Sequence, residues 1–281
     1  MNILIFGATG LLGYELVEFL AKEHQLYLVV KHAAFQKKEN INIIQMNLLD
    51  FDENKLPNDI DCIYYLVQAK NFRDVPNAIL DIFKLNVEVP VRIAKWAIDK
   101  HIKKFIFYSS GGVINQSADK MGFYLDSKLS TETFLRNYAD YFEIFIIMRP
   151  FFIYGPKQEK TMLIRRLFES IKNQVPITLN GENGISINPI FVQDAALISI
   201  AALNLTGYHI LNLAGNETVT IRQISTMIAD IVKSTPNFNF CENVANNLIG
   251  NIDSVSSLLM KPVISLSEGL RLSISQWNND V

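Results

Sequence analysis

The stretch Gly7-Ala8-Thr9-Gly10-Leu11-Leu12-Gly13 directly follows an apolar run, Asn2–Phe6, and opens a segment with helical spacing, Leu11–Lys22. Glycines at such a corner let the backbone turn tightly and approach a pyrophosphate, whose charge then rests on the helix N-terminus and its unpaired N–H groups. A glycine pattern alone is weak evidence for dinucleotide binding. Its position between a strand and an amphipathic helix makes the evidence stronger. The stretch therefore predicts a dinucleotide-binding domain at the start of the chain.

Apolar runs rich in β-branched residues alternate with helix-spaced segments through the first half of the chain. The predicted strands are Asn2–Phe6, Leu26–Val30, Ile41–Met46, Cys62–Val67, Lys104–Ser109 and Glu143–Met148, and the predicted helices are Leu11–Lys22, Ala78–Lys100 and Gly122–Tyr138. Apolar strands that alternate with helices indicate a parallel sheet covered on both faces. Pro90 lacks an N–H donor inside the long second helix, so we expect a bend there or two shorter helices.

The sequence changes character after Pro156, where shorter helical segments are separated by turn clusters. The predicted helices are Leu163–Asn173, Asp194–Leu203 and Ile221–Lys233, and the Asn-rich stretch Thr235–Asn251 is expected to be irregular. The fold class is therefore α/β, a Rossmann-type doubly wound parallel sheet with a smaller, mixed C-terminal substrate-binding cap. We assign residues 1–155 to the dinucleotide-binding domain, expect 189–214 to return to it, and assign 156–281 mainly to the cap.

Composition and charge exclude several classes of protein. The 281 residues are 49% hydrophobic and 19% charged, which suits a large core and excludes intrinsic disorder. The formal charge of −2 does not favour nucleic acid or an anionic membrane surface. The two cysteines lie far apart, the four histidines show no metal-ligand spacing, and no segment has the pattern of a membrane span or a signal peptide. We expect a cytoplasmic protein with no metal, membrane or nucleic acid partner.

Tyr124 and Lys128 lie four positions apart in the predicted helix Gly122–Tyr138 and share one of its faces. A free tyrosine has a pKa near 10, so acid–base work near neutrality requires that this pKa fall by about 3 units. A neighbouring ammonium and the positive nicotinamide of an oxidised cofactor would both favour the phenolate. Because the fifth predicted strand leads into Ser109-Ser110-Gly111-Gly112, the pattern predicts a site made of Ser110, Tyr124 and Lys128.

These motifs resemble the extended short-chain dehydrogenase/reductase family of NAD-dependent epimerases and dehydratases, which includes UDP-galactose 4-epimerase. The resemblance runs nearly end to end and is carried, in the family's order, by the glycine corner, Asn86-Val87, Lys104–Ser110, Arg149–Pro156, Pro189–Ala196, Asn212–Gly215 with Val219-Thr220, Asp253 and Ser267–Leu270. It implies that Tyr124 is the general acid/base. It also implies that Lys128 activates this tyrosine and binds the nicotinamide ribose, and that Ser110 hydrogen-bonds the reacting substrate oxygen.

The resemblance further implies which residues bind the dinucleotide. They belong to the glycine corner, to the ends of the second to fifth strands, to the Tyr–Lys pair and to a segment after the sixth strand: Gly7, Thr9, Gly10, Leu11, Leu12, Gly13, Lys31, Asn47, Leu48, Leu66, Val67, Gln68, Ser109, Tyr124, Lys128, Pro150, Phe151 and Ile153. An acidic residue after the second strand would hold the ribose hydroxyls of NAD. Because Lys31 and His32 stand there, we expect NAD or NADP, with a slight preference for NADP.

Departures from the family pattern narrow the reaction. The family's dehydratases carry Asp-Glu after the catalytic hydroxyl residue, whereas Gly111-Gly112 follow Ser110 here, so dehydration is not expected. The interval from Ser110 to Tyr124 is only 14 residues, which predicts a truncated substrate-facing loop. No arginine stands at Ile187-Asn188, where sugar epimerases often hold the nucleotide phosphate, and Arg165 or Arg166 would have to replace it.

The expected function is that of an NAD(P)-dependent epimerase or oxidoreductase. Such an enzyme moves a hydride between nicotinamide and a secondary alcohol or ketone carbon of a sugar, which we expect to be nucleotide-linked. The alternatives are an NADPH-dependent keto-sugar reductase and a non-catalytic dinucleotide-binding regulator, and the retained Tyr–Lys pair favours an enzyme. The two long helices near 78–100 and 122–138 form a dimer in many relatives, so a homodimer is among the expected states.

Overall fold

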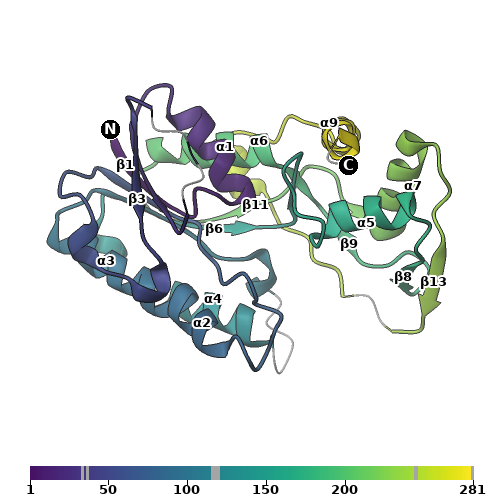
Figure 1. Cartoon of the computed structure of the whole chain (residues 1–281), viewed down its shortest axis with the longest axis horizontal. Coiled ribbons are helices and arrows are strands. Elements are labelled where there is room, and N and C mark those ends of the chain that lie inside the picture. Colours follow the sequence, from purple (N-terminus) through teal and green to yellow (C-terminus); the bar gives the residue numbers. More distant parts are fainter. Residues whose placement is uncertain (33–34, 36–37, 115–120, 244–245, 280–281) are drawn as a thin grey trace. The chain divides into compact units, whose positions relative to one another are not determined.

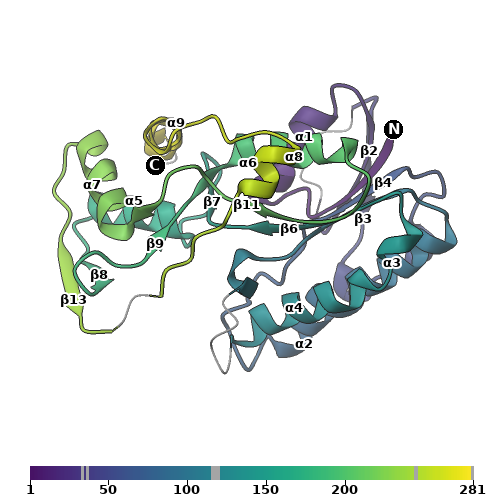
Figure 2. The same cartoon turned by 180° about the vertical axis from the view of Figure 1, so that it is seen from behind.

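A computed structural model of the chain describes residues 1–32, 35, 38–114, 121–243 and 246–279, and is drawn in Figures 1 and 2. The chain divides into two compact units. The first contains Met1–Arg149 and Ser199–Leu211, and the second contains Pro150–Ile198 and Asn212–Val281. Each unit is therefore built from two segments of chain.

A seven-stranded sheet forms the centre of the first unit, in the order β11-β6-β5-β4-β1-β2-β3. The strands are β1 (Asn2–Phe6), β2 (Gln25–Val30), β3 (Ile41–Gln45), β4 (Cys62–Tyr65), β5 (Lys104–Tyr108), β6 (Ile144–Pro150) and β11 (Gly207–Leu213). All neighbouring pairs from β6 to β3 are parallel. The six strands predicted from the sequence are confirmed, and both ends of each agree to within two residues.

Helices cover both faces of this sheet, with α1 on one face and α2, α3 and α4 on the other (Figure 1). Their bounds are α1 (Leu11–Leu20), α2 (Ile79–Phe83), α3 (Val89–Asp99) and α4 (Phe123–Arg136). The core under α3 and α4 is apolar and includes Phe6, Tyr65, Ile93, Phe107 and Leu135. This arrangement confirms the predicted Rossmann-type, doubly wound sheet.

The long second helix is interrupted, but not at Pro90. A π-helical stretch, Lys84–Glu88, joins α2 to α3, and Pro90 lies in the first turn of α3. The N–H of Val89 donates to the carbonyl of Lys84 in the π-helical pattern, and Pro90, which has no N–H, follows directly after it. The expectation of two shorter helices is confirmed, with the break displaced to the turn before the proline.

The second unit combines short paired strands with helices around its own apolar core, which includes Phe168, Ile224, Leu270 and Trp277. Its elements are β7 (Ile153–Tyr154), α5 (Leu163–Lys172), β8 (Ile177–Asn180), β9 (Ser186–Ile187), β10 (Ile190–Phe191), β12 (Val219–Thr220), α7 (Ile221–Val232), β13 (Phe238–Cys241), α8 (Asp253–Leu258) and α9 (Leu266–Asn279). Helix α6 (Val192–Ala201) begins in this unit and ends in the first. Within the described residues, no helix has both the length and the apolar character needed to span a bilayer.

The expectation of an irregular Thr235–Asn251 is wrong for Phe238–Cys241. These four residues form β13 and pair in parallel with β8, and Phe238 packs against the core of the second unit. The hydrogen bonds to β8, together with one apolar anchor, outweigh the low strand propensity of the asparagines around them.

Candidate active site

Gly7 and Gly13 make the corner between β1 and α1 possible. Gly7 has a φ of +89°, and a Cβ there would lie 3.2 Å from the backbones of Leu66 and Val67. A Cβ on Gly13 would lie 2.2 Å from the carbonyl oxygen of Gly7, closer than a side chain can approach. The two glycines therefore let β1, α1 and the segment after β4 meet through main-chain atoms.

The N-terminus of α1 is open at this corner. The N–H of Gly10 donates to the carbonyl of Gly7 at 3.1 Å, and no side chain among the described residues caps the helix. Thr9 and Gly10 are exposed, Leu11 is half-buried and Leu12 is buried. The unpaired N–H groups and the positive end of the helix dipole suit a pyrophosphate. The corner therefore fits the dinucleotide expected from the sequence.

Replacing Gly13 with alanine is expected to lower the melting temperature by about 5 °C, because overpacking against a backbone oxygen costs about 2 kcal/mol. Thermal unfolding of the cofactor-free protein measures this. Gly10→Ala is the matched control, since its Cβ would lie 3.4 Å from the nearest atom, at ordinary contact distance. Equal melting temperatures for the two variants would contradict the role given to Gly13.

The residues expected to select between NAD and NADP follow β2, and two further residues expected to bind the cofactor, Asn47 and Leu48, follow β3. Lys31 and His32 are both exposed. Asn47 is engaged locally, because its side chain accepts from the N–H of Leu49 at 3.3 Å and donates to Asp50 at 3.0 Å. Leu48 packs against the core of the first unit. Their expected contacts with the cofactor stay predictions.

The structure brings Tyr124 and Ser110 together. Tyr124 lies in the first turn of α4, half-buried, and its hydroxyl donates to Oε1 of Gln68 at 2.8 Å. Burial raises the pKa of Tyr124, and a hydrogen bond with the Ser110 side chain lowers that pKa in part. Ser109 is also buried, and no hydrogen-bond partner for its hydroxyl lies among the described residues. Of the two serines after β5, Ser110 is therefore the one that the structure relates to Tyr124.

Lys128 lies one helical turn after Tyr124 and is 1% exposed. Its Nζ donates to the carbonyls of Val67 at 3.1 Å and Tyr108 at 2.9 Å, so it ties the end of β5 to the segment after β4. Burial lowers the pKa of Lys128 from 10.5 to about 7, against the opposing effect of Glu132.

The expectation that the Lys128 ammonium lowers the pKa of Tyr124 is therefore not met in this structure. The amine is directed at two carbonyls, and burial raises the pKa of the phenol. The protein's own groups thus leave the phenol protonated near neutrality. Of the two charges expected to lower the pKa of Tyr124, only the positive charge of an oxidised nicotinamide is left.

Lys128 gives the stability of the protein a pH dependence. Between about pH 7 and pH 10.5 the unfolded chain holds a proton on this lysine that the folded chain lacks, so the free energy of unfolding rises with pH. Cys62 acts in the opposite sense above pH 9, because burial keeps its thiol protonated only in the folded state. We expect a rise of up to about 1.4 kcal/mol per pH unit between pH 7 and pH 9, measured by urea unfolding. The rise should vanish in Lys128→Met, and a flat wild-type curve would contradict the assignment.

Asn86 is a site residue that the sequence reasoning did not select, although its motif was recognised. It is fully buried in the π-helical stretch. Its Nδ2 donates to Oγ of Ser127 at 2.9 Å, and its Oδ1 accepts from the N–H of Ala69 at 3.2 Å. Asn86 therefore positions both α4 and the segment after β4. An asparagine on the apolar face of a predicted helix is the signal that could have found it.

Pro150, Phe151 and Ile153, which were expected to bind the dinucleotide, belong to the second unit. Phe151 is 1% exposed, its N–H donates to the carbonyl of Leu213, and its ring lies 2.8 Å from where a Cβ on Gly250 would stand. Ile153 is half-buried in β7. Their expected contact with the cofactor stays a prediction.

Arg165 is one expected substitute for the missing phosphate-binding arginine, but its side chain makes contacts within the second unit instead. It is 6% exposed, its Nη1 donates to the carbonyl of Gln158 at 3.0 Å, and its guanidinium lies 5.6 Å from the ring centre of Trp277. The position itself is filled by Ile187 and Asn188, both buried. Arg166 is exposed and remains the candidate for binding the nucleotide phosphate.

The expected truncated loop includes residues 115–120, which lie outside the described part of the chain.

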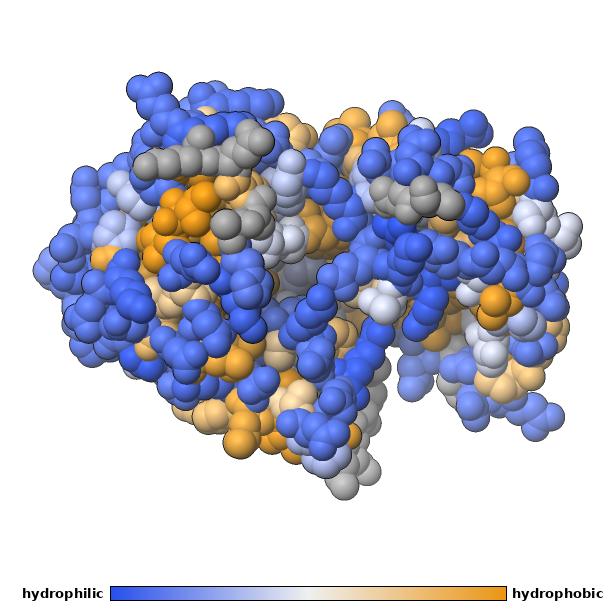
Figure 3. All heavy atoms as spheres, viewed as in Figure 1, coloured by the Kyte–Doolittle hydropathy of each residue, from blue (hydrophilic) through white to orange (hydrophobic). Residues whose placement is uncertain are grey.

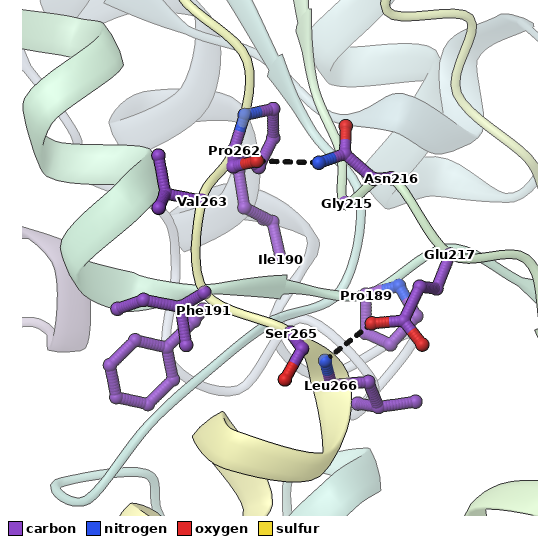
Figure 4. Close-up of a pocket in the computed structure, with 11 residues that line it drawn as sticks. Pro189, Ile190, Phe191, Gly215, Asn216, Glu217, Pro262, Val263, Ser265 and Leu266 are labelled. Carbon is purple, nitrogen blue, oxygen red and sulfur yellow. Dashed lines mark hydrogen bonds between the residues drawn. The ribbon is translucent and has the colours of Figure 1, made fainter.

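A pocket of about 240 Å³ lies in the second unit (Figure 4). The amide of Asn216 donates to the carbonyl of Pro262 on its wall, and the carboxylate of Glu217 accepts from the N–H of Leu266 at 2.6 Å. None of the predicted site residues lines this pocket.

The fold and the site define a dinucleotide-binding enzyme of the Rossmann type with a Ser–Tyr–Lys constellation. The family model of the NAD dependent epimerase/dehydratase family matches residues 3–214, so the chain belongs to that family. The resemblance inferred from the sequence and the class of enzyme are both confirmed.

Similar proteins cover the whole chain. An uncharacterized UDP-glucose epimerase, YtcB, of Bacillus subtilis (strain 168) is 25% identical, over 98% of this chain and 97% of that protein. UDP-glucuronate 4-epimerase of Thermodesulfobacterium geofontis (strain OPF15) is 23% identical, over 99% and 96%. Among solved structures, UDP-glucuronic acid 4-epimerase of Bacillus cereus, in complex with UDP-glucuronic acid and NAD, has a TM-score of 0.87 at 24% identity, over 100% of both chains. This likeness confirms the fold.

Proposed function

We propose that the protein is an NAD-dependent nucleotide-sugar epimerase that inverts a secondary alcohol of a UDP-linked sugar. One observation carries the proposal: the glycine corner and the catalytic residues converge on the segment Leu66–Gln68. Gly7 approaches its backbone, Lys128 donates to the carbonyl of Val67, and Tyr124 donates to Gln68. A pyrophosphate at the corner would thus share one support with the acid–base residue.

The chain's own residues account for the proton and for the orientation of the substrate. NAD, when bound, supplies a reversible acceptor for the hydride that leaves the carbinol carbon. Tyr124, as the phenolate that the positive charge of an oxidised nicotinamide would favour, takes the proton of the substrate hydroxyl as that C–H bond breaks and returns the same proton when the hydride goes back to the opposite face. Ser110 donates to the same oxygen and stabilises its developing charge. The cofactor is regenerated in each cycle.

The cofactor we propose is NAD. It is the cofactor named in the complex of the Bacillus cereus relative. The preference for NADP, inferred from Lys31 and His32, has no support from the similar proteins. Both side chains are exposed, so the local charge does not exclude NAD.

The test is to incubate the purified protein with UDP-glucose, UDP-glucuronic acid and UDP-N-acetylglucosamine and to resolve the epimers chromatographically. We expect one of them to be inverted with no net change in nicotinamide absorbance, and native mass spectrometry to detect bound NAD. Stoichiometric oxidation of NADH or NADPH with a 4-keto-sugar, in the absence of epimerisation, would instead establish the reductase. No turnover in any of these assays would overturn the proposed function.

We also propose that the protein is a cytoplasmic homodimer. Leu80 and Phe83 of α2 and Phe134 of α4 have exposed fractions of 80%, 50% and 55%. Apolar side chains gather over these helices in Figure 3. Burial of this face against a second copy would remove it from water. Light scattering of the purified protein should give twice the mass of one chain, and the mass of one chain would contradict the proposal.

A further inference from the structure

Gln68 lies between two residues whose backbones are fixed by buried side chains of α4 and of the π-helical stretch. The carbonyl of Val67 accepts from Nζ of Lys128 at 3.1 Å. The N–H of Ala69 donates to Oδ1 of Asn86 at 3.2 Å. Lys128 and Asn86 are 1% and 0% exposed. The backbone of Gln68 is therefore fixed from both sides, although its own side chain is exposed.

The side chain that this backbone presents reaches the reacting atom of Tyr124. Oε1 of Gln68 accepts the phenol proton at 2.8 Å, and the ring of Phe72, from the same segment, packs on the Tyr124 ring with centroids 4.6 Å apart. The side chain of Ser110 acts on the same phenol and lowers its pKa in part. The segment after β4 thus contacts Tyr124 at both its ring and its hydroxyl.

We propose that Gln68 is a positioning residue for Tyr124, whose amide serves as hydrogen-bond partner to both proton states of the phenol. A primary amide carries an acceptor oxygen and two N–H donors. It can accept from the phenol, as in this structure, and after rotation about its last side-chain bond it can donate to the phenolate. The inference rests on the proposed function, in which Tyr124 passes through both states in every cycle.

The chemistry of an amide separates this role from packing alone. A carboxylate of the same size could only accept, and its negative charge would disfavour a phenolate about 3 Å away by roughly one pH unit even at the dielectric of water. A methionine of similar length would offer neither an acceptor of comparable strength nor a donor. The two variants therefore remove different parts of the proposed role.

The experiment compares the pH dependence of kcat for wild type, Gln68→Glu and Gln68→Met. We expect the ascending limb of Gln68→Glu to move up by about one pH unit, with activity regained at high pH, and kcat of Gln68→Met to fall about fivefold at every pH. Because the proposed role of Gln68 acts through the hydroxyl of Tyr124, KM should change less than kcat. Gln276→Glu, an exposed glutamine of α9, is the matched control and should keep the wild-type profile.

A second readout needs no substrate. Tyrosinate absorbance of the NAD-loaded protein, taken as a difference against Tyr124→Phe, titrates this phenol directly, and Gln68→Glu should shift that titration in the same direction as the activity limb. An unshifted limb and titration in Gln68→Glu would overturn the inference while leaving the proposed function intact. If wild type shows no epimerisation, the titration still tests the hydrogen bond.

Discussion

Replacing Tyr124 with phenylalanine is expected to lower kcat of epimerisation by about a thousandfold while the affinity for NAD stays nearly unchanged. The phenol oxygen is the atom that donates to Gln68, and general acid–base catalysis contributes about 10² to 10⁴ in rate. The ring itself would remain against Phe72, so the helix start should hold its place. Initial rates by chromatography and NAD binding by calorimetry measure the two quantities.

Tyr141→Phe is the control for this loss. Tyr141 is 65% exposed and lies beyond the end of α4, so the same chemical change there should leave both rate and affinity at wild-type values. Turnover at the wild-type rate in Tyr124→Phe would contradict the assignment of Tyr124 as the acid–base residue. A protein that binds NAD and shows no turnover even as wild type would instead fit a dinucleotide-binding regulator.

Replacing Arg149 with methionine is expected to cost about 3 kcal/mol of folding free energy and to lower the melting temperature by roughly 10 °C. Arg149 makes two hydrogen bonds with Glu132, Nε to Oε1 at 3.0 Å and Nη2 to Oε2 at 2.5 Å. The side chains are only 18% and 5% exposed. Removal of the guanidinium would leave a carboxylate buried without its partner, and thermal unfolding measures the loss.

The surface pair Lys103–Glu143 provides the matched comparison. Its atoms lie 2.9 Å apart, but the side chains are 58% and 62% exposed, and exposed pairs contribute little. Lys103→Met should therefore leave the melting temperature within about 2 °C of wild type. Equal losses in the two variants would mean that burial does not govern the Arg149 contact.

The central sheet could be predicted because its strands are continuous apolar runs. β1, β4, β5 and β6 are almost wholly buried, so they have no surface face to pattern, and their apolar runs alone indicate buried parallel strands. β11 was not predicted as a strand. Its first four residues, Gly207 to Ile210, are exposed or half-buried, so it lacks a continuous apolar run. β13 was missed because its stability comes from pairing with β8, about sixty residues earlier in the chain. Such pairing leaves no local pattern.

The candidate site could be predicted in its residue types and only partly in its contacts. The spacing of Tyr124 and Lys128 on one helical face follows from helix geometry. The partners of Lys128, two backbone carbonyls, depend on where the loops after β4 and β5 end. The same holds for Gln68, which sequence reasoning placed beside the cofactor and the structure places on the phenol. A short motif gives no information about loop conformation of this kind.

The close approach of Gly7 and Gly13 to neighbouring main-chain atoms has a consequence for how this chain can evolve. Atoms of the peptide backbone are the same in every residue, so a contact made from them cannot be adjusted gradually by exchanging one side chain for another. Contacts made by side chains can therefore change by small substitutions. The main-chain contacts at Gly7 and Gly13 can change only by substitutions that disrupt them. The two glycines of the corner are therefore expected to persist while side chains elsewhere in the chain are exchanged.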